Sequence, residues 1–237
     1  TRFSFTSNLD DDEITIDTVR NLPSHSVIVW TGHGSYSSKL GPILCLGKVH
    51  DQAEIMRYQK EIGEDAVYLS TSGGVRISSK FFDNFMKKES FEGSLVYFNT
   101  CFSYTDNRLA NSILDLGAIA YLGNSTETNS IYAFDIVYGF LEGLTPVSTG
   151  SYYRPIQEAL SYAKLKHGAT DWAMGGEVKL ACQFDFALPE MIAIKDGAYR
   201  VNSGSNLILC DANGEEITDY TMYIAKSYKF CDQYLSA

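Results

Sequence analysis

The segment VIVWTGHG, Val27 to Gly34, runs from an apolar stretch into a turn and sets one histidine between two glycines. Val27 to Trp30 follow one another without polar alternation, which predicts a strand covered on both faces of its sheet. Such strands are typical of parallel sheets in α/β proteins, whose reactive groups collect where the strands end. Because His33 stands at that point, the segment predicts a fold class and a candidate site together.

Helical patterns alternate with strand patterns over about the first 165 residues. We expect strands at 26–31, 43–46, 94–99 and 118–122, a hairpin at 68–78, and helices at 14–22, 52–62, 81–88, from Asp106 to Gly117, from Thr128 or Asn129 to Leu144, and at 155–166. This alternation predicts an α/β three-layer sandwich in which a mostly parallel sheet is flanked by helices.

The pattern changes after about residue 170 to short β-like runs separated by turn signals. The runs lie at 178–184, 191–194, 207–210 and 220–225. We therefore expect an α/β domain over residues 1–170 and a β-rich C-terminal segment over residues 171–237. This segment either extends the edge of the sheet or packs against it as a small module, and the sequence leaves both arrangements open.

The charge balance limits the partners of the chain. Acidic residues outnumber basic ones by 29 to 19, and the formal net charge is −10. Because the lysines and arginines are scattered, they form no basic stripe for a phosphate backbone, so nucleic acid is excluded as a partner. No apolar run approaches the roughly 20 residues of a membrane span, and we expect a soluble protein.

Five widely spaced cysteines argue against a complete disulfide framework and against a C-x-x-C metal cluster. At least one thiol is therefore expected to be free. The acidic run Asp10 to Glu13 is interpreted as a solvated helix start rather than as a calcium loop. We expect neither a metal nor another cofactor.

Two residues suited to nucleophilic catalysis follow apolar strands. His33 comes after the first strand, and Cys101 comes directly after the strand expected at 94–99. A thiol attacks as a thiolate or with a base at hand, and an imidazole titrates near neutral pH, so the pair suits acyl transfer. Gly34 has no side chain, so a substrate carbonyl could approach its backbone N–H, which becomes a candidate oxyanion donor.

The order of these elements resembles the caspase-like cysteine peptidases of clan CD. The resemblance rests on Gly32-His33-Gly34 after one apolar strand, on Asn99-Thr100-Cys101 after a second, and on the Gly117 to Gly123 segment after a helix. It covers about residues 14 to 165 and is closer to the bacterial gingipain, clostripain and CHAT-type members than to animal caspases. The Gln-Ala-Cys-x-Gly signature of caspases is missing.

The resemblance implies a role for each residue of the candidate site. Cys101 becomes the nucleophile and His33 the group that protonates the leaving amine, with the N–H groups of Gly34 and Cys101 as the oxyanion hole. The residue two positions before the cysteine and the loop after the next strand would wall the primary specificity pocket. These pocket residues are Asn99 and the loop Asn124 to Thr128, with Asn124, Ser125 and Glu127 as the candidate substrate contacts. The substrate would be a protein or peptide.

Asn99 departs from the pattern of relatives that cut after arginine or lysine. Those enzymes carry a carboxylate at this position, and a neutral amide cannot balance a buried guanidinium. Glu127 could supply the charge from the opposite loop, or the pocket could select a polar or small residue. No arginine stands at either pocket position, which argues against a preference for aspartate. We therefore expect a basic or neutral residue before the scissile bond.

A catalytically silent binding or scaffold protein of the same fold is the alternative function. The sequence leaves the oligomeric state and the compartment open. For the compartment, it slightly favours a secreted or cell-surface bacterial protein.

Overall fold

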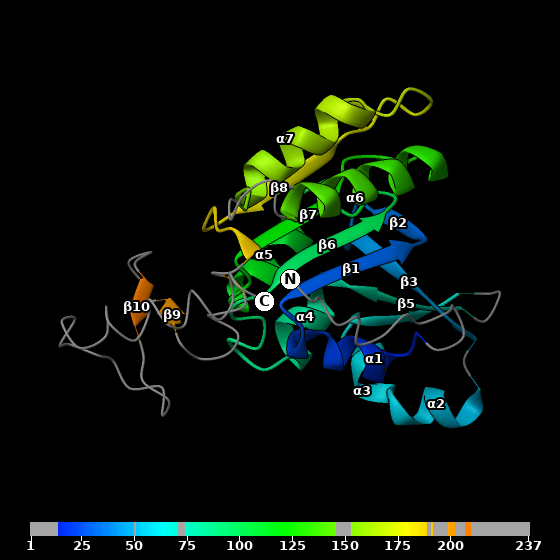
Figure 1. The fold of residues 1–237 in the computed structure, drawn as a ribbon. Helices are drawn as coiled ribbons and strands as arrows, with labels where there is room; N and C mark the ends of the chain where they lie inside the picture. Colours follow the sequence, from blue (N-terminus) through cyan, green and yellow to red (C-terminus); the bar gives the residue numbers. More distant parts are fainter. Residues whose placement is uncertain are drawn as a thin grey trace.

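The computed structural model describes residues 14–49, 51–70, 74–145, 153–188, 191, 199–201 and 207–209. Its main sheet contains β1 (Val27–Gly32), β6 (Leu95–Thr100), β7 (Ala120–Asn124) and β8 (Val178–Cys182), side by side in that order (Figure 1). β1, β6 and β7 run parallel, whereas β8 pairs with β7 in the antiparallel direction. The sheet is mostly parallel, as the sequence predicted.

Helices cover both faces of the main sheet. One face packs against α1 (Ile16–Asn21), α4 (Ser79–Phe85) and α5 (Arg108–Asp115), and the other packs against α6 (Ser130–Leu144) and α7 (Ile156–His167) (Figure 1). All six residues of β6 are buried, and its four apolar residues, Leu95 to Phe98, alternate between the two cores. Their unbroken apolar pattern therefore has its physical cause in burial on both sides.

A second sheet is antiparallel throughout, and it takes in the strand expected at 43–46 and the expected hairpin, so these strands are not part of the mostly parallel sheet. Its order is β2 (Gly34–Ser37), β3 (Gly41–Val49), β5 (Gly74–Ser78) and β4 (Val67–Leu69). The expected hairpin at 68–78 is confirmed as β4 and β5. β2 was expected to be part of a loop, since Gly-Ser-Tyr-Ser has no apolar pattern. It forms because it pairs with β3, with Gly34 opposite Leu44.

Two helices replace the single helix expected at 52–62. They are α2 (Gln52–Arg57) and α3 (Gln59–Gly63), and the buried Tyr58 separates them. The helix expected at 14–22 is confirmed as α1. A short 3-10 helix, η2 (Leu22–Ser24), follows directly after it. At α6, Asn129 rather than Thr128 caps the helix by accepting the Ile131 N–H.

The C-terminal β runs are described in part. β8 extends the main sheet, whereas β9 (Tyr199–Val201) and β10 (Leu207–Leu209) pair with each other as two antiparallel strands. The run at 220–225 and the acidic stretch at 10–13 lie outside the described residues. Over the described part of the chain, every helix is too short or too polar to cross a membrane.

The two helices α6 and α7 approach each other through small residues. A Cβ added to Gly143 would lie 2.9 Å from the Ala159 backbone oxygen and 3.0 Å from the Ala159 Cα. Both atoms belong to the backbone of α7, so a side chain at 143 has to push the helices apart.

Gly143→Ala should therefore destabilise the protein, although alanine is the better helix former. We expect an overpacking cost of about 1–3 kcal/mol that exceeds the propensity gain of about 1 kcal/mol. Gly63→Ala is the matched control, because a Cβ there meets nothing within 4 Å. Urea unfolding of both variants measures the difference, and a Gly143→Ala protein at least as stable as Gly63→Ala would contradict this packing.

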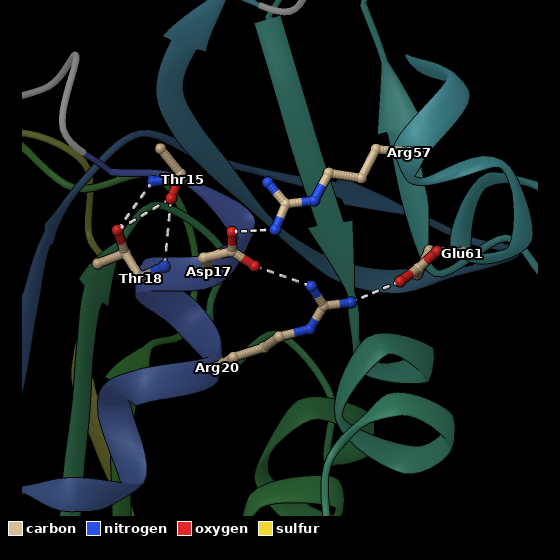
Figure 2. A network of polar contacts seen from close by, with 6 residues as sticks. All are labelled: Thr15, Asp17, Thr18, Arg20, Arg57 and Glu61. Carbon is tan, nitrogen blue, oxygen red and sulfur yellow. Dashed lines mark hydrogen bonds and ion pairs between the residues drawn. The ribbon is translucent and has the colours of Figure 1, made fainter. Parts of the chain in front are cut away.

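A polar network ties α1 to α2 and α3 (Figure 2). Arg20 donates to Asp17 at 2.9 Å and to Glu61 at 2.5 Å, and Arg57 donates to Asp17 at 2.7 Å. The Arg20 guanidinium also lies over the rings of Tyr58 and Phe81, at 5.6 and 5.8 Å from their centroids. The Glu61 side chain is only 9% exposed, so its carboxylate needs Arg20 as an ion-pair partner.

Arg20→Met should cost more stability than Arg57→Met. Loss of Arg20 leaves the Glu61 carboxylate buried without its partner, which we expect to cost about 2 kcal/mol after allowing for the partly exposed arginine. Arg57 pairs with Asp17 in an exposed position, where an ion pair contributes below about 1 kcal/mol. Denaturant unfolding at low and high salt compares the two, and equal losses would refute the special role of Arg20.

Candidate active site

The register of the main sheet brings His33 and Cys101 to the same rim. Thr31 stands opposite Asn99, and Gly32 stands opposite Thr100, in the parallel pairing of β1 with β6. The next residue of each chain segment is therefore His33 or Cys101, and both leave the sheet at its carboxyl edge. His33 is exposed and Cys101 is half-buried, so the imidazole faces solvent while the thiol is partly covered.

Gly34 lies against the backbone of the cysteine. A Cβ added to it would be 2.3 Å from the Cys101 carbonyl oxygen and 2.6 Å from the Thr100 Oγ1. No real Cβ tolerates such distances from a backbone atom, so glycine is required here by close approach. The start of β2 is thereby held directly against the end of β6.

The loop after β7 wraps around the turn that carries Cys101. Phe102 donates its N–H to the Thr126 oxygen at 2.9 Å, and Tyr104 donates to the Asn124 oxygen at 2.8 Å. Phe102 has a φ of 62°, in the left-handed region that bulky residues rarely adopt. The chain therefore accepts local backbone strain directly after the candidate nucleophile, as is common at functional sites.

The Cys101 sulfur has its polar contacts with Thr128. The Thr128 N–H donates to Sγ at 3.4 Å, and the thiol donates to the Thr128 oxygen at 3.8 Å. One backbone residue can thus serve either protonation state of the sulfur, because it offers both a donor and an acceptor.

Asn99 and Asn124, the two amides expected in the specificity pocket, form a buried pair. They are 2% and 1% exposed. Asn124 Nδ2 donates to Asn99 Oδ1 at 3.0 Å and to the Thr100 oxygen at 3.2 Å, and Asn99 Nδ2 donates to the Ala133 oxygen in α6 at 3.0 Å. Asn124 Oδ1 is buried and has no hydrogen-bond partner among the described residues. The pair joins β6, β7 and α6 beneath the Cys101 turn.

The remaining pocket residues differ from each other in their surroundings. Ser125 exchanges two hydrogen bonds with Glu177, through its N–H at 2.9 Å and its Oγ at 3.0 Å. Glu127 is exposed, so its carboxylate is free to meet a charge that arrives from solvent. Of the four predicted pocket residues, Asn99 and Asn124 therefore lie in β6 and β7, Ser125 and Glu127 lie in the loop after β7, and Glu127 is the exposed one.

Cys45 and Cys182 are the other free thiols of the described part of the chain. Cys45 lies beside the site, since its N–H donates to the His33 oxygen at 3.0 Å. Burial is the largest cause that raises the pKa of the Cys45 thiol, while Arg76 lowers it and Cys101 raises it further. Burial also raises the pKa of Cys182 to about 11. Both thiols are thus disfavoured as nucleophiles.

Three residues around Cys101 were missed by the sequence reasoning. Ser103 Oγ donates to the Phe98 and Thr100 oxygens and accepts the Asn124 N–H, which locks the turn. Thr100 Oγ1 is buried behind Gly34 and meets no hydrogen-bond partner in the part of the chain that the structure describes. Asp171 is buried and binds the backbone of Asn129. Their residue types suggest turns, but only the fold shows which backbone groups they meet.

No protein-family model and no curated protein matches the sequence. Within the described ranges, no group of three or more His, Cys, Asp or Glu side chains is placed to hold a metal ion.

Proposed function

We propose that the chain is a cysteine endopeptidase of caspase-like fold that works through an acyl-enzyme on Cys101. The observation that carries the proposal is the β1–β6 register, in which Gly32 stands opposite Thr100 so that His33 and Cys101 follow at one rim. The contact of Gly34 with the Cys101 backbone supports it further, because it brings the candidate oxyanion donors together.

The proposed reaction uses the thiol and the imidazole in turn. The Cys101 thiol gives its proton to His33 as Sγ adds to the carbonyl carbon of the scissile bond, the C–N bond breaks, and the leaving amine takes that proton from His33. Water then gives a proton to His33 as its oxygen adds to the thioester carbon, the C–S bond breaks, the acid product leaves, and His33 returns the proton to the sulfur. The developing oxyanion would be met by the N–H groups of Gly34 and Cys101.

The residue before the scissile bond is proposed to be basic or neutral. Asn124 Oδ1, at the end of β7, is a buried acceptor that no described residue satisfies, and Glu127 offers a carboxylate in the loop that follows. A side chain that donates hydrogen bonds, such as lysine, arginine or glutamine, would satisfy both groups. An aspartate side chain has no donor when ionised and would be repelled by Glu127.

A silent scaffold is the second candidate, and one observation favours it. Asn99 and Asn124 are buried and bonded to each other, so the amides proposed to meet a substrate side chain are covered. A substrate would have to displace part of this pair before a pocket opens.

A peptide library that scans the residue before the cleaved bond separates the two functions. The peptidase should cut after lysine, arginine or glutamine, and Cys101→Ala should leave the library intact. The absence of any cut by the wild-type chain across the library, before and after limited proteolysis, would overturn the peptidase and support the scaffold.

A further inference from the structure

Asp171 carries a buried carboxylate in the loop before β8. The residue is 1% exposed, and its two oxygens accept three backbone N–H groups. Oδ1 accepts from Ala173 at 2.8 Å and from Met174 at 3.2 Å, and Oδ2 accepts from Asn129 at 2.6 Å. A carboxylate removed from water needs such donors, so this one is satisfied by backbone rather than by solvent.

The two carboxylate oxygens hold two different segments. Oδ1 closes the turn of its own loop. The same turn is also held by the Gly175 N–H, which donates to the backbone oxygen of Asp171 at 2.8 Å. Oδ2 reaches Asn129, which lies 42 residues earlier in the chain and caps α6. Asp171 therefore fastens the start of α6 to the loop before β8.

The bonded N–H belongs to the peptide group that faces Cys101. The peptide between Thr128 and Asn129 donates its N–H to Asp171, and its oxygen accepts the Cys101 thiol at 3.8 Å. In a trans peptide the N–H and C=O point in opposite directions, so fixing the N–H aims the oxygen. The preceding N–H, that of Thr128, donates to the same sulfur at 3.4 Å. Neighbouring hydrogen bonds of this kind also polarise one another.

We propose that Asp171 is a positioning residue of the Cys101 site, which orients the Thr128–Asn129 peptide so that Thr128 holds the sulfur in place for attack. The attack itself rests on the proposed function, whereas the orientation of the peptide does not. Asp171 touches no reacting atom and acts through the Thr128 backbone.

Asp171→Asn tests the proposal with the least change in shape. An amide offers one oxygen and one N–H₂ group, so asparagine can accept hydrogen bonds on one side only. On the other side its own N–H₂ group faces a backbone N–H, and two donors cannot bond to each other. We expect kcat to fall about 10- to 100-fold, with KM changed less than about threefold. Amide hydrogen exchange over residues 126–130 should quicken. Glu177→Gln is the matched control, because it makes the same change from carboxylate to amide in the same loop. The Glu177 carboxylate pairs with Lys164 and not with the Asn129 N–H.

Two variants at Asn129 test the N–H should the Asp171 variant fail to fold. Asn129 has a φ of −65°, which proline adopts, so Asn129→Pro removes the N–H and places the ring Cδ against Asp171 Oδ2, which breaks the contact. Asn129→Ala keeps the N–H and loses only the cap. We expect Asn129→Pro to lower kcat at least about tenfold below Asn129→Ala.

The outcomes separate this proposal from the proposed function. If the wild type cleaves nothing, hydrogen exchange over 126–130 still decides whether Asp171 fixes the peptide. Wild-type kcat and exchange in Asp171→Asn, or equal kcat in the two Asn129 variants, would overturn the positioning role. A fall in activity that only tracks the unfolded fraction, at unchanged exchange in the folded protein, would overturn it as well.

Discussion

Cys101→Ala should lower kcat/KM for peptide cleavage by about 10⁴- to 10⁶-fold, the loss expected when a nucleophile is removed from an acyl-transfer site. The folded protein should remain, because the half-buried sulfur has its polar contacts with Thr128 alone among the described residues. His33→Ala should lower kcat/KM by about 10²- to 10⁴-fold through loss of proton transfer.

Cys182→Ala is the matched control for the nucleophile. This thiol is also half-buried, but it lies on β8 and donates to the Phe184 oxygen at 2.6 Å. Its raised pKa of about 11 leaves about one thiolate in a thousand at pH 8. Activity should be retained in Cys182→Ala, and cleavage by Cys101→Ala at the wild-type rate would remove the basis of the proposed function.

Gly34→Ala should also lower activity strongly, although it adds only one methyl group. The new Cβ would lie 2.3 Å from the Cys101 oxygen and 2.6 Å from Thr100 Oγ1, so β2 must move away from the end of β6. That movement separates the candidate oxyanion donors and the His33 segment from the sulfur. We expect kcat/KM to fall about 10²- to 10³-fold, with a stability loss of about 1–3 kcal/mol.

Gly32→Ala is the control on the same segment. Its Cβ would meet the Trp30 side chain at 3.3 Å, and a side chain can yield where a backbone oxygen cannot. Activity within about threefold of wild type is expected for Gly32→Ala. Kinetics and thermal unfolding of both variants decide the point, and equal behaviour of the two would contradict the close approach of Gly34 to Cys101.

The strands that carry the candidate site could be predicted because both are apolar without alternation, over 27–30 and 95–98. β6 is buried on both faces, β1 is buried on one face and half-buried on the other, and His33 and Cys101 follow the ends of these strands. The sequence pattern of the second sheet is weaker. β2 has no apolar pattern of its own and forms because it pairs with β3 as a hairpin, with Ser37 opposite Gly41.

The surroundings of the sulfur could not be predicted from residue types. Asn99 and Asn124 were predicted as pocket residues, whereas their hydrogen bond to each other across β6 and β7 has no signal in the sequence. Asp171 lies 70 residues from Cys101 in the chain and acts on a backbone N–H, which carries no sequence signal. Backbone partners of this kind are fixed by the fold and not by any spacing in the sequence.

Covalent mapping of the nucleophile tests the central claim most directly. The wild-type chain is treated with peptidyl acyloxymethyl ketones that carry Lys, Arg, Gln, Asn or Asp before the reactive carbon, then digested and analysed by mass spectrometry. We predict an adduct on Cys101 with at least one of the first three, lost in His33→Ala. Adducts confined to Cys45 or Cys182, or no adduct with any of the five, would contradict the account.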